Sequence, residues 1–224
     1  ITILTNTGAR VIEAGGWTEL ALGKIDDVVP ATGQQGTEVT LSGSGLLGGG
    51  SDLVSVTLAG TDAAEYTASS SEVLLKIDSA DAGSGDIVLI ADTGAIITAA
   101  DAWEYVKVAE INAVSPAEGQ TDTLVVISGD GMRGGAAEIV TVSLGSTEAK
   151  IVTESDSEVV VVAAHSDDDL NQVGDVTMVT SSGSYVVGES QWTYLERGQI
   201  DAVTPAGGIG GTRVQLTGER LLGG

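Results

Sequence analysis

Three tryptophans and three prolines recur along the chain at the same intervals of 86 and then 89 residues. They are Trp17, Trp103, Trp192, Pro30, Pro116 and Pro205. Each tryptophan precedes its proline by 13 residues. This is the feature that most restricts the fold, because a pattern that recurs at a fixed interval indicates a tandem array of one structural unit.

The sequence around these positions keeps the same register. The stretch KIDDVVPATGQQGTEVTLSG (24–43) aligns with EINAVSPAEGQTDTLVVISG (110–129) and with QIDAVTPAGGIGGTRVQLTG (199–218). The predicted organisation is the C-terminal part of one unit (1–22), two complete units (23–108 and 109–197) and the N-terminal part of a further unit (198–224). We expect the array to continue beyond both ends of this sequence.

Within each unit the pattern predicts β-strands. Apolar and polar residues alternate over short runs bounded by Gly, Asp, Ser and Asn, as in half-buried strands. The run VSVTLAG is predicted to place Val54, Val56 and Leu58 on one face. The β-branched run EVVVVAA (158–164) is predicted to be a strand covered on both faces. No stretch has a capped helical pattern.

About seven short strands in each unit of about 87 residues predict an all-β fold, made of tandem immunoglobulin-like β-sandwiches. Gly94 and Gly183 each lie between two predicted strands, where a hairpin turn requires a positive φ. The loop LLGGGS (46–51) and its partner MRGGA (132–136) share a central glycine pair. This loop precedes a strand rather than a helix and has no lysine, which argues against a phosphate cradle.

These residues resemble the IPT/TIG immunoglobulin-like domain, whose pattern is a strand ending in V-x-P, then G-x-x-G-T, then a strand closing in T-G or S-G. The matching positions are Val28, Pro30, Gly33, Gly36, Thr37 and Gly43, and again Val203, Pro205, Gly208, Gly211, Thr212 and Gly218. The middle unit keeps Val114, Pro116, Gly119 and Gly129 but has Asp122 in place of the second glycine. The resemblance implies the fold; such domains occur in transcription factors, receptor ectodomains and long extracellular arrays.

Charge excludes some of these functions. The net charge of -23 argues against nucleic-acid binding, which requires clustered Lys and Arg. It also argues against docking on an anionic membrane, and no apolar run is long enough to insert directly into one. The chain contains no cysteine and no Asn-X-Ser/Thr sequon, so disulfides and N-glycans are not expected. O-linked glycans on outward Ser and Thr are the alternative.

No candidate catalytic residue emerges, and we expect no enzyme activity and no cofactor. The only histidine, His165, is predicted to lie in a surface loop. The acidic run Asp167, Asp168 and Asp169 is expected to be a solvated loop, with weak Ca²⁺ binding as the alternative, because the EF-hand spacing is lacking. The three tryptophans, in a chain without Phe, are expected to pack the core or the contacts between units, as repeat anchors together with the three prolines.

The sequence therefore predicts a structural protein, a segment of a long extracellular or cell-surface array that forms a fibre, filament or appendage. Its partners would be neighbouring units or copies of itself, through unit-to-unit packing and strand edges. A cell-surface adhesion or receptor ectodomain that binds a protein or glycan is the first alternative. An accessory module of a secreted carbohydrate-active enzyme is the second.

Overall fold

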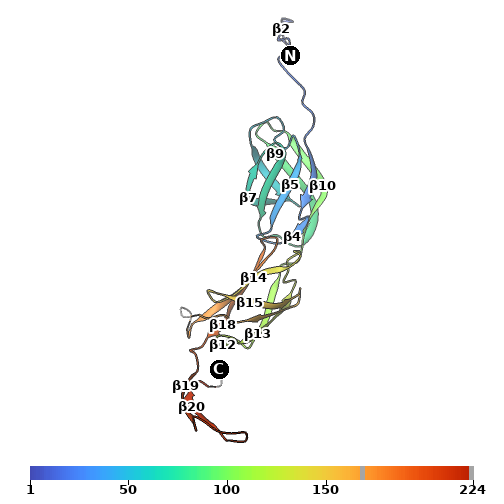
Figure 1. Cartoon of the computed structure of the whole chain (residues 1–224). Coiled ribbons are helices and arrows are strands. Elements are labelled where there is room, and N and C mark those ends of the chain that lie inside the picture. The colour runs from blue at the N-terminus through green and yellow to red at the C-terminus, as the bar shows by residue number, and fades with distance from the viewer. Residues whose placement is uncertain (167–169, 222–224) are drawn as a thin grey trace.

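The computed structural model describes residues 1–166 and 170–221, in which every regular element is a β-strand. Two sandwiches follow one another along the chain, and the β1–β2 and β19–β20 hairpins lie at opposite ends of the molecule (Figure 1). No helix with the length and hydropathy needed to cross a membrane occurs in this part of the chain. The all-β, tandem immunoglobulin-like prediction is confirmed.

The first sandwich contains eight strands. They are β3 (Lys24–Val29), β4 (Thr32–Gly33), β5 (Glu38–Ser44), β6 (Leu53–Leu58), β7 (Thr61–Ala68), β8 (Glu72–Ile77), β9 (Gly83–Ala91) and β10 (Ile96–Tyr105). Neighbouring strands pair in the order β3-β5-β8-β7-β6-β9-β10-β4. All of these pairs are antiparallel except β4 with β10, which is parallel.

The second sandwich repeats this arrangement. Its strands are β11 (Glu110–Ser115), β12 (Glu118–Gly119), β13 (Leu124–Asp130), β14 (Ile139–Leu144), β15 (Thr147–Glu154), β16 (Glu158–Val162), β17 (Val173–Thr180) and β18 (Tyr185–Tyr194). They pair in the order β11-β13-β16-β15-β14-β17-β18-β12. The 86-residue repeat in sequence thus becomes a repeat of topology.

Two places in each sandwich join its two sheets. In the first sandwich, β7 pairs with β6 through Thr61 and Asp62 and with β8 through residues 63–68. The chain also leaves β3 at Pro30 and continues as β4, which lies against β10 in the opposite sheet. The strand order still ends at β3, which pairs with β5 alone, and β4 covers only Glu104 and Tyr105 of β10.

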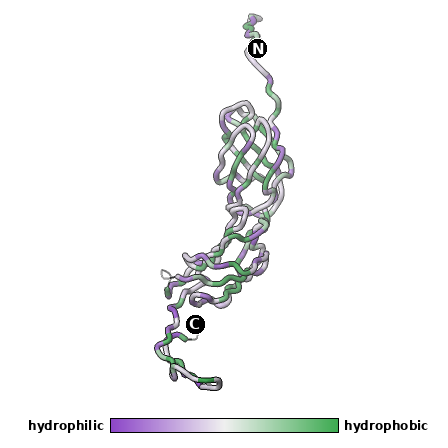
Figure 2. The backbone as a smooth tube through the Cα atoms, in the orientation of Figure 1, coloured by the Kyte–Doolittle hydropathy of each residue, from purple (hydrophilic) through white to green (hydrophobic). Residues whose placement is uncertain are grey.

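Each sandwich has its own core. Hydrophobic and hydrophilic residues are interleaved along the strands of both sandwiches (Figure 2), and the hydrophobic ones on the inner faces form two separate buried clusters. The largest fully buried side chains include Trp103 and Tyr105 in the first cluster and Trp192 and Tyr194 in the second. Burial of apolar area in two independent cores is the main term that stabilises each unit.

One strand face differs from the prediction. In β6, Leu53 and Val56 are buried but Val54 is 63% exposed, so the prediction that Val54 shares a face with Val56 and Leu58 is wrong. The pairing of β6 with β9 shifts register between Leu53 and Ser55. This β-bulge adds one residue to the strand and turns Val54 outward.

The prediction for the run 158–164 is also wrong in part. In β16, Val159 and Val161 are fully buried, but Val160 and Val162 on the other face are only half-buried. The strand lies in the middle of a sheet that has the core on one side only. A continuous β-branched run is therefore compatible here with one solvent-facing side.

The chain ends form two hairpins. Strand β1 (Thr2–Leu4) pairs with β2 (Arg10–Ile12), and β19 (Gln199–Thr204) pairs with β20 (Gln215–Glu219). The two internal hairpin glycines have the predicted positive φ, 81° at Gly94 and 85° at Gly183.

Candidate functional site

Two of the three repeat tryptophans lie inside the sandwiches. Trp103 and Trp192 are each 1% exposed. Each indole ring stands edge-on against a tyrosine, with ring centroids 5.6 Å apart for Trp103 and Tyr105 and 5.4 Å apart for Trp192 and Tyr194. Buried rings in this arrangement contribute packing energy beyond their area.

Trp17 differs from these two. It is 77% exposed, because its part of the chain contributes only the β1–β2 hairpin to a unit and no second sheet covers it in the described residues. The expectation of a packed position therefore does not hold for Trp17 in this chain.

The three prolines share one structural position. Pro30, Pro116 and Pro205 come directly after β3, β11 and β19, and the peptide bond before each is cis. Proline has no N–H to donate, which is consistent with the end of strand pairing at this point. In the two complete units, the chain then crosses to the other sheet and forms a short strand followed by a turn.

The proposed weak Ca²⁺ residues Asp167, Asp168 and Asp169 lie outside the described residues, so their side chains are not placed. His165 just before them is exposed. Within the described residues, no group of three or more His, Asp or Glu side chains is arranged to hold a metal ion.

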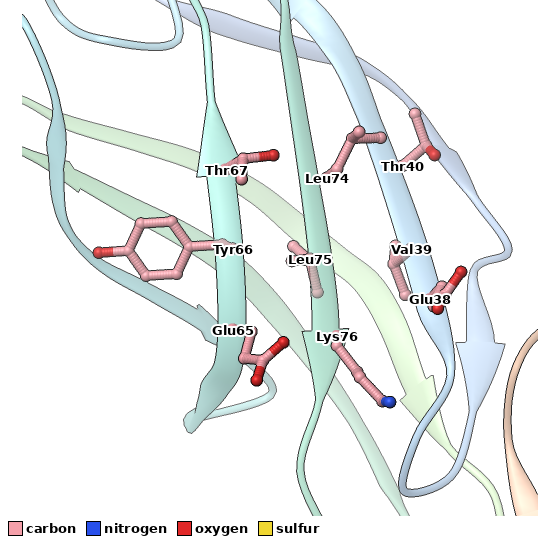
Figure 3. Close-up of a pocket in the computed structure, with 9 residues that line it drawn as sticks. All are labelled: Glu38, Val39, Thr40, Glu65, Tyr66, Thr67, Leu74, Leu75 and Lys76. Carbon is pink, nitrogen blue, oxygen red and sulfur yellow. The ribbon is translucent and has the colours of Figure 1, made fainter.

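A shallow hollow of about 450 Å³ lies on the outer face of β5, β8 and β7 (Figure 3). Lys76 on β8 is paired in register with Glu38 on β5 and with Glu65 on β7, which makes a row of alternating charge. Thr40, Leu74 and Thr67 form the next row. This open face therefore provides a polar, charged surface.

The second sandwich has an ion pair that the first lacks. Arg133 donates to both carboxylate oxygens of Glu154, at 3.0 Å from Nε and 2.7 Å from Nη2, and Glu154 also accepts from the Ile139 N–H at 3.2 Å. The hydrogen bonds from Arg133 hold the pKa of Glu154 below its ordinary value. Leu47 and Ala68 stand at the equivalent positions of the first unit, so this pair is specific to the second.

The junction between the two sandwiches is formed by residues to which the sequence pattern gave no functional role. The turn after β4, residues 34–37, is at the lower end of the first sandwich in Figure 1, next to the second sandwich. It meets two parts of that sandwich, the glycine loop before β14 and the hairpin between β17 and β18.

Gln34 is the centre of this junction, and its side chain is 3% exposed. Its Oε1 accepts a hydrogen bond from the Ala109 N–H at 2.7 Å, and its Nε2 donates to the Tyr185 carbonyl at 3.5 Å. Both ends of this buried amide therefore bind main-chain groups of the second unit. A buried donor left without such an acceptor would cost about 1–3 kcal/mol.

The glycine pair of the repeat makes room for this side chain. Gly134 has a φ of 56°, and a Cβ there would lie 2.7 Å from Gln34 Nε2. Gly135 has a φ of 85°, and a Cβ there would lie 3.1 Å from Thr32 Oγ1. The pair is thus required by the backbone conformation and by the close approach of the preceding unit.

A second contact lies beside the first. The Glu38 N–H donates to the Ser182 carbonyl at 2.8 Å, which links β5 to the hairpin of the second sandwich. The Tyr185 ring covers Gly36, where a Cβ would lie 2.7 Å from its Cδ1. Gly36 and Gly183 also face each other, since a Cβ on Gly183 would lie 3.2 Å from the Gly36 carbonyl oxygen.

The next junction uses the same residue. Gln120 occupies the position of Gln34 in the second unit, and its Oε1 accepts from the Gly198 N–H at 2.9 Å. Ala109 and Gly198 are themselves equivalent, because each is the residue before the first strand residue of its unit. In the repeat alignment these two glutamines occupy the same position of their units, but only the fold shows that each binds the following unit.

The comparisons with known proteins agree with this architecture. The family model described as IPT/TIG domain matches residues 24–105 and again residues 109–194. No curated protein matches the chain by sequence.

Among solved structures, the full extracellular region of plexin A4 matches with a TM-score of 0.54 and 19% identity over 86% of this chain. A second structure of that region has a TM-score of 0.50, again at 19% identity, over 81% of the chain. The chain spans 17% and 19% of the lengths of these two plexin chains.

An SGBP-B from a xyloglucan utilization locus of Bacteroides uniformis matches with a TM-score of 0.32 and 15% identity, over 77% of this chain and 50% of its own. At these identities the plexin likeness concerns the fold. The family model, in contrast, covers both complete sandwiches, and the chain therefore belongs to the IPT/TIG domain family, with two such domains in tandem.

Proposed function

We propose that the chain is a structural, non-catalytic segment of an extracellular or cell-surface array of IPT/TIG domains that assembles into a fibre, filament or appendage. The observation that supports this proposal is the closed junction between the two sandwiches, held by Gln34 and by the Glu38–Ser182 hydrogen bond. The connection between the two sandwiches is short, and these contacts hold the sandwiches to each other beside it. Such a junction restricts the motion between domains and favours a stiff rod.

The direction of the chain through the molecule supports the same proposal. The β1–β2 and β19–β20 hairpins lie beyond opposite ends of the pair of sandwiches (Figure 1), so units completed from these hairpins would extend the rod rather than fold back on it. The acidic surface would keep such a rod hydrated and separate from its neighbours at low ionic strength.

Electron microscopy tests the proposal directly. The purified chain, concentrated at neutral pH and moderate salt, is expected to give long thin filaments in negative stain and a rising mass in light scattering. A chain that stays monomeric by light scattering at high concentration, and gives only single particles in negative stain, would contradict the fibre proposal.

A receptor or adhesion ectodomain is the second candidate, and the likeness in fold to part of the plexin A4 extracellular region favours it. The working surface would then be a face such as the charged row of Glu38, Lys76 and Glu65. Binding of the labelled chain to cells or to a glycan array, lost on Lys76→Glu and kept on Lys150→Glu, would support this candidate over the fibre.

A further inference from the structure

The turn after the first strand has the same backbone in all three units but a different side chain in one of them. In the first unit the Gln34 N–H donates to Thr37 Oγ1 at 3.2 Å, and in the second the Gln120 N–H donates to Thr123 Oγ1 at 3.0 Å. In the third, the Ile209 N–H donates to Thr212 Oγ1 at 3.0 Å. The glutamine side chain is therefore not needed to form the turn.

What the glutamine does provide is an acceptor for the next unit. Gln34 accepts from Ala109 and Gln120 accepts from Gly198, 75 and 78 residues further along the chain. These two N–H groups come just before β11 and β19 and lie at the point where each following unit begins. Ile209 has an apolar side chain and offers no such acceptor.

The surface of the second sandwich that contacts Gln34 is complementary to its side chain. In the second sandwich the glycine loop surrounds the Gln34 amide, since a Cβ on Gly134 would lie 2.7 Å from Nε2 and 2.8 Å from Cδ. The first sandwich has the same pair, Gly48 and Gly49, with φ of 56° and 79°, close to the 56° and 85° of Gly134 and Gly135. Donor, glycine pair and glutamine thus form one interface at the junction between the two complete sandwiches. The next junction repeats the donor and the glutamine.

From this we infer that the side chain at the position of Gln34, Gln120 and Ile209 determines how firmly one IPT/TIG unit holds the next. Glutamine locks the following unit through its first main-chain N–H and the glycine loop, whereas isoleucine leaves that unit free to move. The partner recognised by this interface is another unit of the same kind, with a glycine pair and a free N–H before its first strand. This extends the proposed function, and its relevance to a stiff rod rests on that function.

Hydrogen exchange in the full chain measures the contact between the glutamine and the next unit at each junction separately. Gln34→Ile is expected to lower the protection of the Ala109 amide by roughly tenfold, the ratio that corresponds to about 1.4 kcal/mol, and to leave Gly198 unchanged. Gln120→Ile should do the reverse. Gln35→Ile, at the half-buried neighbouring position, is the matched control and should change neither.

Protection of core amides such as Val125 and Val161 shows that each variant is folded. If Gln34→Ile lowers these amides as much as Ala109, or leaves Ala109 unchanged, the inference is wrong.

A distance measurement tests the motion itself. Because the chain has no cysteine, Ser71→Cys and Glu148→Cys give one exposed spin-label site on each sandwich. The distance distribution between the labels is expected to be narrow in the parent chain and with Gln35→Ile, and broad with Gln34→Ile. Equal widths in all three would overturn the inference.

These measurements use the monomeric chain and do not depend on filaments. If Gln34→Ile lowers the protection of Ala109 and broadens the distance distribution but the chain forms no filaments, only the proposed function is contradicted. If the chain forms filaments but Gln34→Ile changes neither measurement, only this inference is contradicted.

Discussion

Asp122 occupies a left-handed backbone position that the other two units give to glycine. Its φ is 67°, against 88° at Gly36 and 91° at Gly211. Residues with a Cβ lose about 1 kcal/mol or more in this region, although Asp tolerates it better than most. The sequence comparison identified the departure from the family pattern here, and the structure shows that the turn is kept at some conformational cost.

Substitution of Asp122 should separate the strain of its left-handed backbone from the effect of glycine flexibility in the unfolded chain. Asp122→Ala is expected to lower the free energy of unfolding by about 1 kcal/mol, because alanine keeps the Cβ and loses the tolerance of Asp for this region. Asp122→Gly should stay within about 1 kcal/mol of the parent, since relief of strain is offset by the flexibility of glycine in the unfolded chain. Denaturant unfolding followed by tryptophan fluorescence gives both values, and a less stable Gly than Ala variant would contradict the explanation.

The ion pair of the second sandwich predicts a dependence on pH. The folded state lowers the pKa of Glu154 below its ordinary value of 4.5, mainly through the hydrogen bonds from Arg133. The carboxylate therefore contributes stability above pH 4.5, and this contribution is lost as the pH falls through the lowered pKa.

Glu154→Gln should reduce the loss of stability between about pH 5 and pH 3 relative to the parent chain. Glu148→Gln, at an exposed position, is the control and should keep the parental slope. Urea unfolding at a series of pH values measures the difference, and identical slopes for the parent and Glu154→Gln would show that the pair has no such role.

At the scale of the strand, β16 presents two different faces within one run of valines. Val161 is fully buried and Val160 is half-buried on the outer face. Val161→Thr should cost about 1–3 kcal/mol, because it places a hydroxyl in the apolar core. Val160→Thr should stay within about 0.5 kcal/mol of the parent. Equal losses in thermal or denaturant unfolding would mean that the outer face is covered as well.

The strands themselves follow from the alternation of apolar and polar residues, and so do the hairpin turns at Gly94 and Gly183. The orientation of Val54 did not follow, because a β-bulge changes the register by one residue and depends on the partner strand β9 rather than on β6 alone. The two-faced character of β16 was equally hidden, since valine favours a strand whether its outer face is covered or open.

At the scale of the whole molecule, the tandem array and the fold of its units were predictable from the repeat, whereas the junction was not. Gln34 is an unremarkable polar residue in a turn until Ala109 and Tyr185 are brought to it from 75 and 151 residues away. Contacts between units depend on how two folded surfaces meet, and a pattern within one unit does not contain that information.

The net charge gives a prediction at this same scale. With -23 charges on 224 residues, copies of the chain repel one another at low ionic strength. Raising the salt from about 0.01 M to about 0.1 M shortens the screening length from about 30 Å to about 10 Å. Self-association measured by light scattering should therefore increase with salt and towards the isoelectric point near pH 4.1. Association that weakens with added salt would indicate attraction between opposite charges instead.

The parallel pairing of β4 with β10 has a mechanical consequence. The Glu104 and Val106 N–H groups donate to the carbonyls of Ala31 and Gly33, each at 3.0 Å, and Thr193 and Leu195 repeat this pattern in the second sandwich. A pull on the two ends of a unit drags its first and last segments past each other in opposite directions. These hydrogen bonds would then be loaded simultaneously, in shear, instead of breaking one after another.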